Sequence, residues 1–192
     1  MKSVTLRVVC GLCMILVTAV DAFAQPVSPP VQLPQAPPPP VAAPPPATAT
    51  PCTALQLSAS FVSSEGAAGT ILDTLQLTNT SSVTCTVQGF VTLHMIDAGG
   101  INVTTRDVPG GGILNRPPDP DPIALAPGQS SPFGVAWSDV PVGNETTCPA
   151  AAMLAVTPPG GFTELSVPVD LAPCGGGTVN VGALRAPGES VL

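Results

Sequence analysis

Between residues 54 and 184 the chain runs as short stretches of alternating apolar and polar residues, which turn-forming residues interrupt about every 8–12 positions. The clearest stretch is Leu75–Gly100, where Leu75 and Leu77 alternate with polar neighbours and a second alternating run begins at Phe90. A period of two places the apolar side chains on one face of a β-strand. Because no stretch repeats with the period of a helix, the pattern predicts an all-β domain built as an antiparallel sandwich of short strands.

Nine strands are expected, with loops over residues 63–69 and 109–122 between them: 54–62, 70–78, 85–96, 101–108, 123–126, 133–138, 153–157, 162–171 and 178–184. Gly89 marks the place where the third strand bulges or bends from one sheet to another. Trp137 alternates in phase with Phe133 and Val135, so it is expected in the core. The residues after Leu184 are few and polar, and they are expected to fray.

Residues 1–24 have the order of a secretory signal peptide. Lys2 and Arg7 precede the apolar run 8–20, and Ala22-Phe23-Ala24 has the small-residue spacing of a cleavage site. The apolar run is too short to span a bilayer as a helix. We therefore expect cleavage after Ala24, unless the run is kept as an anchor, and no transmembrane segment in the mature chain. Such a protein is secreted, extracellular or held in the cell envelope.

Residues 25–51 contain twelve of the chain's 26 prolines and no charged residue. Proline fixes φ and has no N–H to donate, so this segment is not expected to pair into a sheet. It is expected to be a disordered, proline-rich linker in the polyproline II conformation, about 80 Å long at about 3.1 Å per residue when extended. Residues 52–192 then form the β-sandwich domain, which is long enough to bury a hydrophobic core.

The mature chain is acidic and contains no lysine. Over residues 25–192, eleven carboxylates stand against three arginines, so eleven minus three leaves a net charge near −8. Nucleic acids and anionic membrane surfaces are bound through lysine and arginine, so neither is an expected partner. The expected partner is an unknown envelope or extracellular protein, or a glycan.

Four cysteines remain in the mature chain: Cys52, Cys85, Cys148 and Cys174. An even number of cysteines in an exported chain indicates two disulfides. Of the three possible pairings we favour Cys52–Cys85 and Cys148–Cys174, because each joins strand ends that lie close along the chain. The second pair flanks a predicted hairpin whose turn is residues 158–161. The alternative is a four-cysteine zinc site, which would lack any C-x-x-C pair.

The sequence offers no catalytic, cofactor-binding or metal-binding residue. His94 is the only histidine, and it lies on the polar face of its expected strand, so it cannot form a histidine-rich metal site. Neither a nucleophile elbow nor a phosphate-binding loop motif occurs. The one acidic group of interest is Asp107, Asp119 and Asp121, two of which lie in the proline- and glycine-rich loop. Either all three carboxylates serve an enzyme, or Asp119 and Asp121 bind calcium weakly, or the run is a solvated loop.

The domain resembles the secreted actinobacterial domain-of-unknown-function family 4232. The residues that carry the resemblance run in order over most of 52–184: Cys52-x-x-Leu55, Ala67-Ala68-Gly69-Thr70, Leu75-Gln76-Leu77-Thr78-Asn79-Thr80-Ser81, Cys85-Thr86-Val87-Gln88-Gly89-Phe90, Leu125-Ala126-Pro127-Gly128, Trp137-Ser138, Cys148-Pro149, Val156-Thr157-Pro158-Pro159-Gly160 and Cys174-Gly175-Gly176-Gly177. Two features depart from it, namely Val91 after Phe90 and the proline- and glycine-rich residues 108–122. The resemblance implies an exported or envelope-attached, immunoglobulin-like domain with four cysteines, and it supplies no catalytic residue.

From these observations we predict a secreted or cell-envelope β-sandwich that is not an enzyme and acts as an interaction or binding module on a proline-rich stalk. The alternative is a hydrolase or metal-dependent enzyme that uses the carboxylates of Asp107, Asp119 and Asp121.

Overall fold

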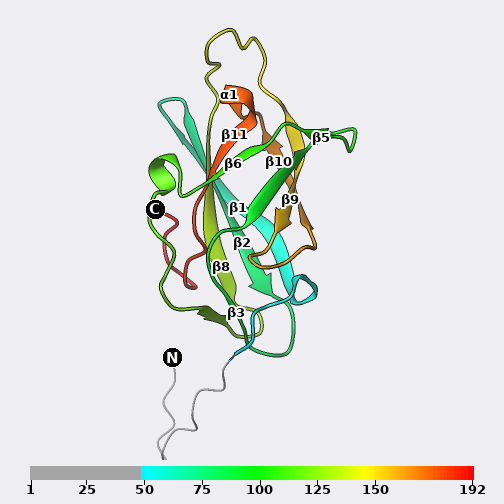
Figure 1. Cartoon of the computed structure of the whole chain (residues 1–192), viewed down its shortest axis with the longest axis vertical. Coiled ribbons are helices and arrows are strands. Elements are labelled where there is room, and N and C mark those ends of the chain that lie inside the picture. Colours follow the sequence, from blue (N-terminus) through cyan, green and yellow to red (C-terminus); the bar gives the residue numbers. More distant parts are fainter. Residues whose placement is uncertain (1–48) are drawn as a thin grey trace, which may run out of the picture. The chain divides into compact units, whose positions relative to one another are not determined.

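The structure is a computed structural model that describes residues 49–192 (Figure 1). The expected signal peptide, residues 1–24, and residues 25–48 of the expected linker lie outside the described residues. Within the described part the chain is mostly β-structure, as predicted, and no helix there is long and apolar enough to cross a membrane.

The strands form three sheets. The five-stranded sheet has the order β1 (Leu57–Ala67), β2 (Thr70–Asn79), β8 (Ser130–Ser138), β11 (Thr178–Val181) and β6 (Arg106–Pro109). The four-stranded sheet has the order β10 (Leu165–Leu171), β9 (Ala151–Thr157), β4 (Thr92–Ile96) and β5 (Asn102–Val103). The third sheet pairs β3 (Cys85–Val87) with β7 (Ile123–Leu125). Three short helices complete the described part: η1 (Ala54–Gln56), η2 (Gly112–Leu114) and α1 (Cys174–Gly177).

One strand pair departs from the expected antiparallel arrangement. β6 and β11 run parallel, with Arg106 opposite Thr178 and Pro109 opposite Val181. Parallel neighbours need a long connection, and here most of the second half of the chain separates the two strands. The alternation of apolar and polar residues within a strand is the same whether its neighbour runs parallel or antiparallel. The sequence therefore could not distinguish the two arrangements.

Two of the nine expected strands are each divided between two sheets. The stretch expected over 85–96 forms β3 and β4, and Gly89 lies at the corner between them with a φ of +96°. This confirms the predicted bend at Gly89, because only glycine adopts such a φ without strain. The stretch expected over 101–108 likewise forms β5 and β6. Between them the Thr105 hydroxyl accepts a hydrogen bond from the Met95 backbone N–H at 2.7 Å.

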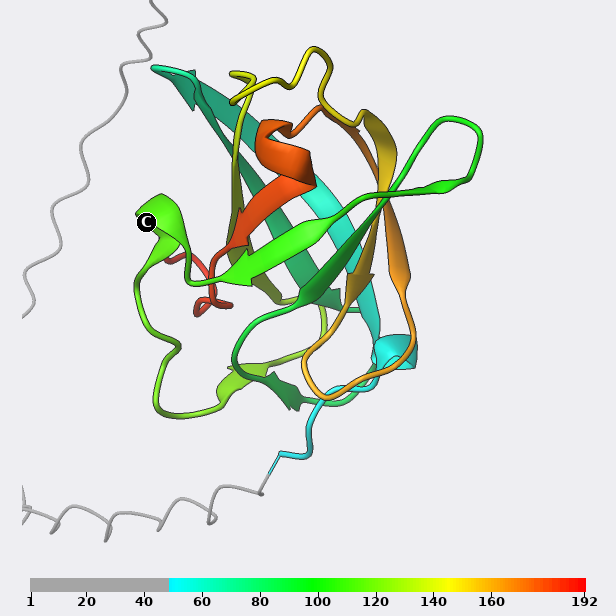
Figure 2. The same ribbon diagram turned by 45° about the horizontal axis from the view of Figure 1, so that its top comes forward.

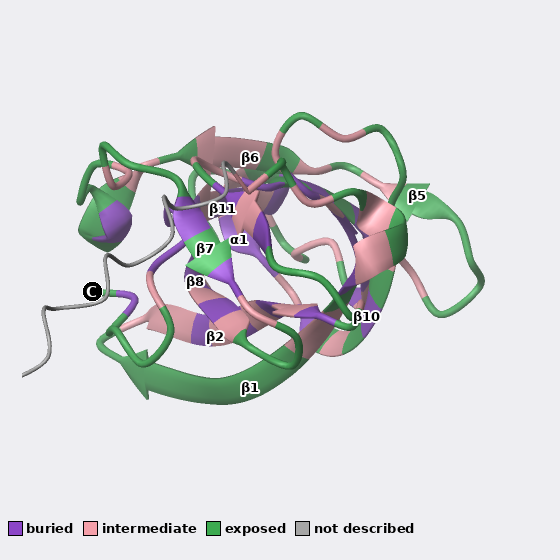
Figure 3. Cartoon of the chain, turned by 90° about the horizontal axis from the view of Figure 1, so that it is seen from below, coloured by how far each residue is buried: buried purple, intermediate pink, exposed green. Residues whose placement is uncertain are grey.

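The first strand was predicted over residues 54–62, but it begins later, at Leu57, and continues further, to Ala67. Gln56 Oε1 accepts a hydrogen bond from the Thr53 backbone N–H at 2.9 Å, and this contact closes residues 54–56 into η1. Leu55 therefore points away from the core and is 93% exposed. Residues 63–67, expected in a loop, continue β1 into a tight hairpin with β2. The register shifts at Val62, and the following residues of β1 are exposed (Figure 3).

The hydrophobic core takes side chains from both large sheets. The five-stranded sheet supplies Leu75, Leu77, Phe133 and Val135, and the four-stranded sheet supplies Leu93, Met95, Leu154 and Val156. Trp137 is 8% exposed and belongs to the same cluster, which confirms its predicted place in the core. Phe162, expected in a strand, is instead fully exposed, because β10 begins only at Leu165.

The C-terminal tail is not frayed, contrary to the prediction. Arg185 is buried, and its backbone N–H donates to the Pro132 carbonyl at 2.9 Å. Its own carbonyl accepts from the Ser131 hydroxyl at 2.6 Å. Val191 is also buried, and the end of the chain lies beside η2 (Figures 1 and 2). A polar tail was expected to be solvated, but β8 and the loop over residues 110–122 supply partners for its polar atoms.

Candidate functional site

Both predicted disulfides are formed. Cys52 pairs with Cys85 and Cys148 pairs with Cys174, with Cα atoms 4.9 Å and 4.6 Å apart. The four cysteines are therefore not available as thiolate ligands, and the alternative of a four-cysteine zinc site is wrong. Each disulfide lies next to a loop that forms part of a surface site.

The Cys52–Cys85 disulfide holds the incoming chain against β3. Cys52 N–H donates to the Thr86 carbonyl at 2.8 Å, and Thr86 N–H donates to the Thr50 carbonyl at 2.9 Å. Pro51 lies between these two hydrogen bonds and forms a parallel bridge with Thr86. A proline can occupy such an edge position because its neighbours make the hydrogen bonds that it cannot make. The last residues of the expected linker thus pair with a strand.

The turn between β9 and β10 places two prolines opposite this segment. Gly161 N–H donates to the Pro158 carbonyl at 3.0 Å, and Gly160 has a φ of +71°. Proline followed by a glycine of positive φ is the arrangement that a type II turn requires, and Pro159-Gly160 supplies it. The ring of Pro158 is buried and that of Pro159 is partly exposed. The turn is rigid because the proline ring fixes its first central residue.

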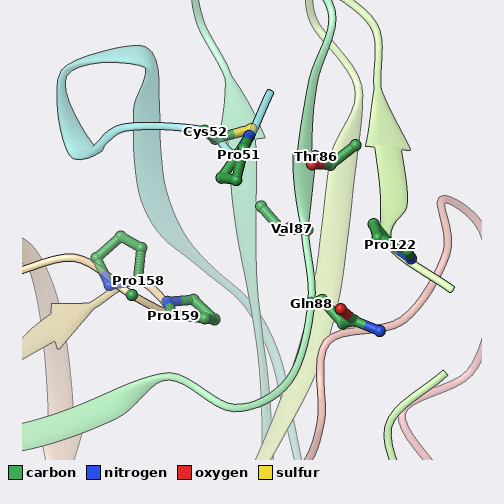
Figure 4. A pocket seen from close by; sticks show the side chains of 9 residues that line it. Pro51, Cys52, Thr86, Val87, Gln88, Pro122, Pro158 and Pro159 are labelled. Carbon is green, nitrogen blue, oxygen red and sulfur yellow. The ribbon is translucent and has the colours of Figure 1, made fainter. Parts of the chain in front are cut away.

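A proline-lined pocket lies between these segments (Figure 4). Gln88 closes one side, and its Nε2 donates to the Pro120 carbonyl at 2.8 Å, which holds Pro122 and its loop in place. The pocket has a volume of about 290 Å³. It is lined by Pro51, Cys52, Thr86, Val87, Gln88, Pro122, Pro158, Pro159 and Gly160. None of these residues carries an ionisable side chain, because Cys52 is disulfide-bonded, so the pocket suits an apolar group.

The three aspartates of the enzyme alternative are not brought together. Asp107 lies in β6 opposite Val179, whereas Asp119 and Asp121 lie in the loop before β7. Within residues 49–192, one group of three acidic, histidine or cysteine side chains has its ligand atoms within 4.8 Å, and it is Glu145 with the bonded Cys148 and Cys174. These positions give the enzyme alternative no common site.

His94 lies on the exposed face of β4, as predicted. Its Nδ1 is 3.3 Å from Oε1 of Glu164, and both side chains are exposed. Leu93 and Met95 on either side point into the core. His94 therefore acts as a surface residue of its strand and faces no other group that could serve as a metal ligand with it in the described part of the chain.

The second disulfide lies beside a backbone site that a carboxylate occupies. Gly175 and Gly176 both have positive φ, so their N–H groups point to the same side. These N–H groups donate to the Glu145 carboxylate at 2.8 and 3.1 Å, and Val142 N–H donates at 3.3 Å. The hydrogen bonds from Gly175 and Gly176 lower the pKa of Glu145 below its ordinary value, and the Val142 bond adds to them.

Asp73 is the residue that the sequence reasoning missed. It is 2% exposed and lies on the core-facing side of β2, in phase with Leu75 and Leu77. Trp137 Nε1 donates to its Oδ2 at 2.7 Å. A carboxylate in the apolar phase of an alternating strand was the available signal, because such a group needs a donor in the core.

A family model described as "Domain of unknown function (DUF4232)" matches residues 52–186. No curated protein and no solved structure matches the chain.

Proposed function

We propose that this chain, which belongs to the family of the domain of unknown function DUF4232, is a non-enzymatic binding module of the cell exterior. The proposal includes an immunoglobulin-like sandwich as its architecture, export by the signal peptide and a proline-rich stalk over residues 25–51, whose last residues pair with β3. The two disulfides support export, because such bonds form and persist in oxidising compartments.

The proline-lined pocket is the observation that carries the proposal. Four of its nine lining residues are prolines, and a disulfide, a tight turn and the Gln88 hydrogen bonds hold the lining in place. Binding to such a preformed surface costs little ordering of side chains. A glycan is a less suitable ligand for this pocket, because sugars stack on exposed aromatic rings and no aromatic residue lines it. We therefore propose that the pocket receives an apolar side chain of an envelope or extracellular protein.

The test uses photo-crosslinking of the full chain in the exporting cell. A benzophenone amino acid replaces Thr86, a half-buried lining residue whose substitution leaves the Gln88 hydrogen bonds in place, and a second chain carries it at the exposed Ile113. We expect one envelope protein, identified by mass spectrometry, to be captured at residue 86 and not at residue 113. Pro122→Glu places a charge in the pocket and should reduce the capture at least about tenfold, since an ion in an apolar site is costly.

The matched control is Pro127→Glu, an equal change at an exposed proline outside the pocket, which should leave capture unchanged. Equal capture from both crosslinker positions, or equal loss with both glutamate variants, would contradict the proposed binding site.

A further inference from the structure

A second cleft lies where the outermost strands of the two large sheets meet. β1 ends the five-stranded sheet and β10 ends the four-stranded sheet, and each has a neighbour on one side only. The two strands are in contact, and between them is a cleft of about 250 Å³. Its lining is Phe61, Ser64, Asp73, Pro168, Val169 and Asp170. It shares no residue with the proline-lined pocket, so each site can be tested without the other.

The floor of this cleft holds a buried carboxylate with one oxygen free. Asp73 Oδ2 accepts the Trp137 indole N–H, and no donor in residues 49–192 reaches Oδ1. In residues 49–192, Arg185 Nε is the one side-chain nitrogen or oxygen that is shielded from solvent and has no hydrogen-bond partner. Asp73 Oδ1 has no partner and is not such an atom, so it must be accessible to solvent. The free oxygen therefore opens into the cleft that Asp73 lines. A buried carboxylate with one oxygen that accepts no hydrogen bond is stabilised most by a cationic hydrogen-bond donor.

The surroundings of Asp73 select the kind of cation. Asp170 adds a second carboxylate at the exposed rim. A calcium ion requires six to eight oxygen ligands, whereas two carboxylates and one serine line this cleft. Phe61 is 43% exposed and presents an aromatic ring, on which a guanidinium stacks well. The rings and methyl groups of Pro168 and Val169 suit the methylene part of a long side chain.

The size of the cleft and its position indicate that it binds a side chain of a larger partner and not a small molecule. A cleft of 250 Å³ is below the roughly 300–1,000 Å³ typical of small-molecule sites. The outer edge of β1 leaves backbone N–H and C=O groups without a strand neighbour, which is where an extended segment can pair. A segment that pairs there sends every second side chain toward one face, so one of them can enter the cleft.

We propose that this cleft binds an arginine side chain from an extended, basic segment of a partner protein. Asp73 Oδ1 accepts a guanidinium hydrogen bond, Asp170 contributes a second negative charge and Phe61 stacks on the guanidinium plane. The charge of the described domain favours such a partner, because eleven carboxylates stand against three arginines in residues 49–192. Of those arginines, Arg185 is buried and Arg116 pairs with Glu189, so a second copy of the chain offers only Arg106.

The experiment follows Trp137, the only tryptophan, by fluorescence in the full exported chain. The probes are the peptide acetyl-Thr-Val-Arg-Val-Thr-amide and the same peptide with citrulline, a neutral analogue of arginine. We expect the arginine peptide to change the Trp137 emission, because it binds the carboxylate that holds the indole N–H. The citrulline peptide should bind at least about tenfold more weakly, and added salt should weaken the arginine peptide selectively.

Four variants locate the binding. Asp73→Asn and Asp170→Asn should each weaken the arginine peptide, the first by at least about tenfold, since a charge partner in a buried site is removed. Asp139→Asn removes the same charge from an exposed residue outside the cleft and should bind like the parent chain. If Asp73→Asn fails to fold, the substitutions Asp170→Asn and Phe61→Ser at exposed residues test whether the peptide binds in this cleft. Both should weaken its binding.

Several results would overturn the inference. These are equal affinity for the arginine and citrulline peptides, unchanged affinity in Asp170→Asn and Phe61→Ser, or no binding of either peptide by calorimetry at millimolar concentration. Competition of calcium alone with the peptide would assign the cleft to a metal ion. A concentration-dependent dimer that Arg106→Ala abolishes would make a second copy the occupant.

Discussion

Arg185 is a charged residue that occupies a core position. Its side chain is 1% exposed, and its guanidinium donates to the carbonyls of Pro117 and Arg116 at 2.8 and 2.9 Å. Burial lowers the pKa of Arg185, and the nearby charge of Arg116 lowers it further. Because an arginine pKa lies far above neutral pH, the group stays charged and depends on these carbonyls. Arg185 thus joins the C-terminal tail to the loop before β7.

Replacing this arginine tests that role. Arg185→Met keeps an unbranched apolar stem but leaves the carbonyls of Arg116 and Pro117 without their donors. We expect the free energy of unfolding to fall by about 2–3 kcal/mol in urea titrations, the cost of buried groups that lose charged hydrogen bonds. Arg106→Met, at an exposed arginine, should change stability by less than about 0.5 kcal/mol. Similar losses in both variants would show that the tail does not depend on Arg185.

The α1 turn and the loop between β8 and β9 lie side by side (Figure 2). Hydrogen bonds from the α1 backbone to the carboxylate of Glu145, in the loop, join them. Three consecutive glycines, Gly175–Gly177, all have positive φ. A Cβ at Gly177 would collide with the Thr104 carbonyl oxygen, so close approach as well as backbone conformation requires glycine there. The carboxylate binds the N–H groups that this conformation presents, and the nearby Cys148–Cys174 bond holds the loop from its other end.

Glu145 makes this contact dependent on pH. Its pKa is lowered in the folded protein from an ordinary value of 4.5, so its contribution to stability is present above pH 4.5. That contribution is lost as the pH falls through the lowered pKa. Glu145→Gln should therefore have a lower melting temperature than the parent chain at pH 7, and the difference should shrink in acid. Hydrogen exchange in residues 139–147 should be faster in the variant at pH 7.

The matched control is Glu164→Gln, which removes an equal charge from an exposed residue that accepts no backbone hydrogen bond in the described part of the chain. A difference between Glu145→Gln and the parent chain that stays constant with pH would contradict the contact with Gly175 and Gly176.

At the scale of the whole molecule, the two disulfides close separate loops at different places in the fold. Cys52–Cys85 spans 33 residues and fixes the incoming chain to β3, whereas Cys148–Cys174 spans 26 residues and closes the β9–β10 hairpin. The loops do not overlap in sequence, so their effects on the unfolded chain are independent. A domain of this kind is stable by only about 5–15 kcal/mol, and two such bonds supply a large part of that.

We expect the double substitution of either pair by alanine to lower the free energy of unfolding by roughly 3–4 kcal/mol, because the unfolded chain regains its freedom. The loop lengths predict costs within about 0.2 kcal/mol of each other. Removing both pairs should cost about the sum, as measured by urea unfolding without reductant. A loss below about 1 kcal/mol for either pair would mean that the unfolded alanine variant keeps that loop closed by other contacts.

Features that depend on neighbouring residues could be predicted from the sequence. The alternation around Leu75 and Leu77 determined which side chains face the core, and Pro159-Gly160 determined the turn between β9 and β10. Because that hairpin is local, it also brought Cys148 and Cys174 together, and the pairing followed. Gly89 marked a corner because few other residues adopt its φ. The physical reason is common to all four: conformational preferences and short loops act over a few residues.

Only the tertiary structure decided which sheet each strand joins, which strands lie at the edges and which polar residues are buried. Residues 101–108 read as one strand, yet β5 and β6 lie in different sheets, since alternation is the same whichever neighbour a strand has. Asp73 and Arg185 are buried only because Trp137 in one case, and the carbonyls of Arg116 and Pro117 in the other, are brought to them across the fold. The alternation places Asp73 in the apolar phase of β2, but burial of a charged group also depends on a distant partner, which no local pattern of residues identifies.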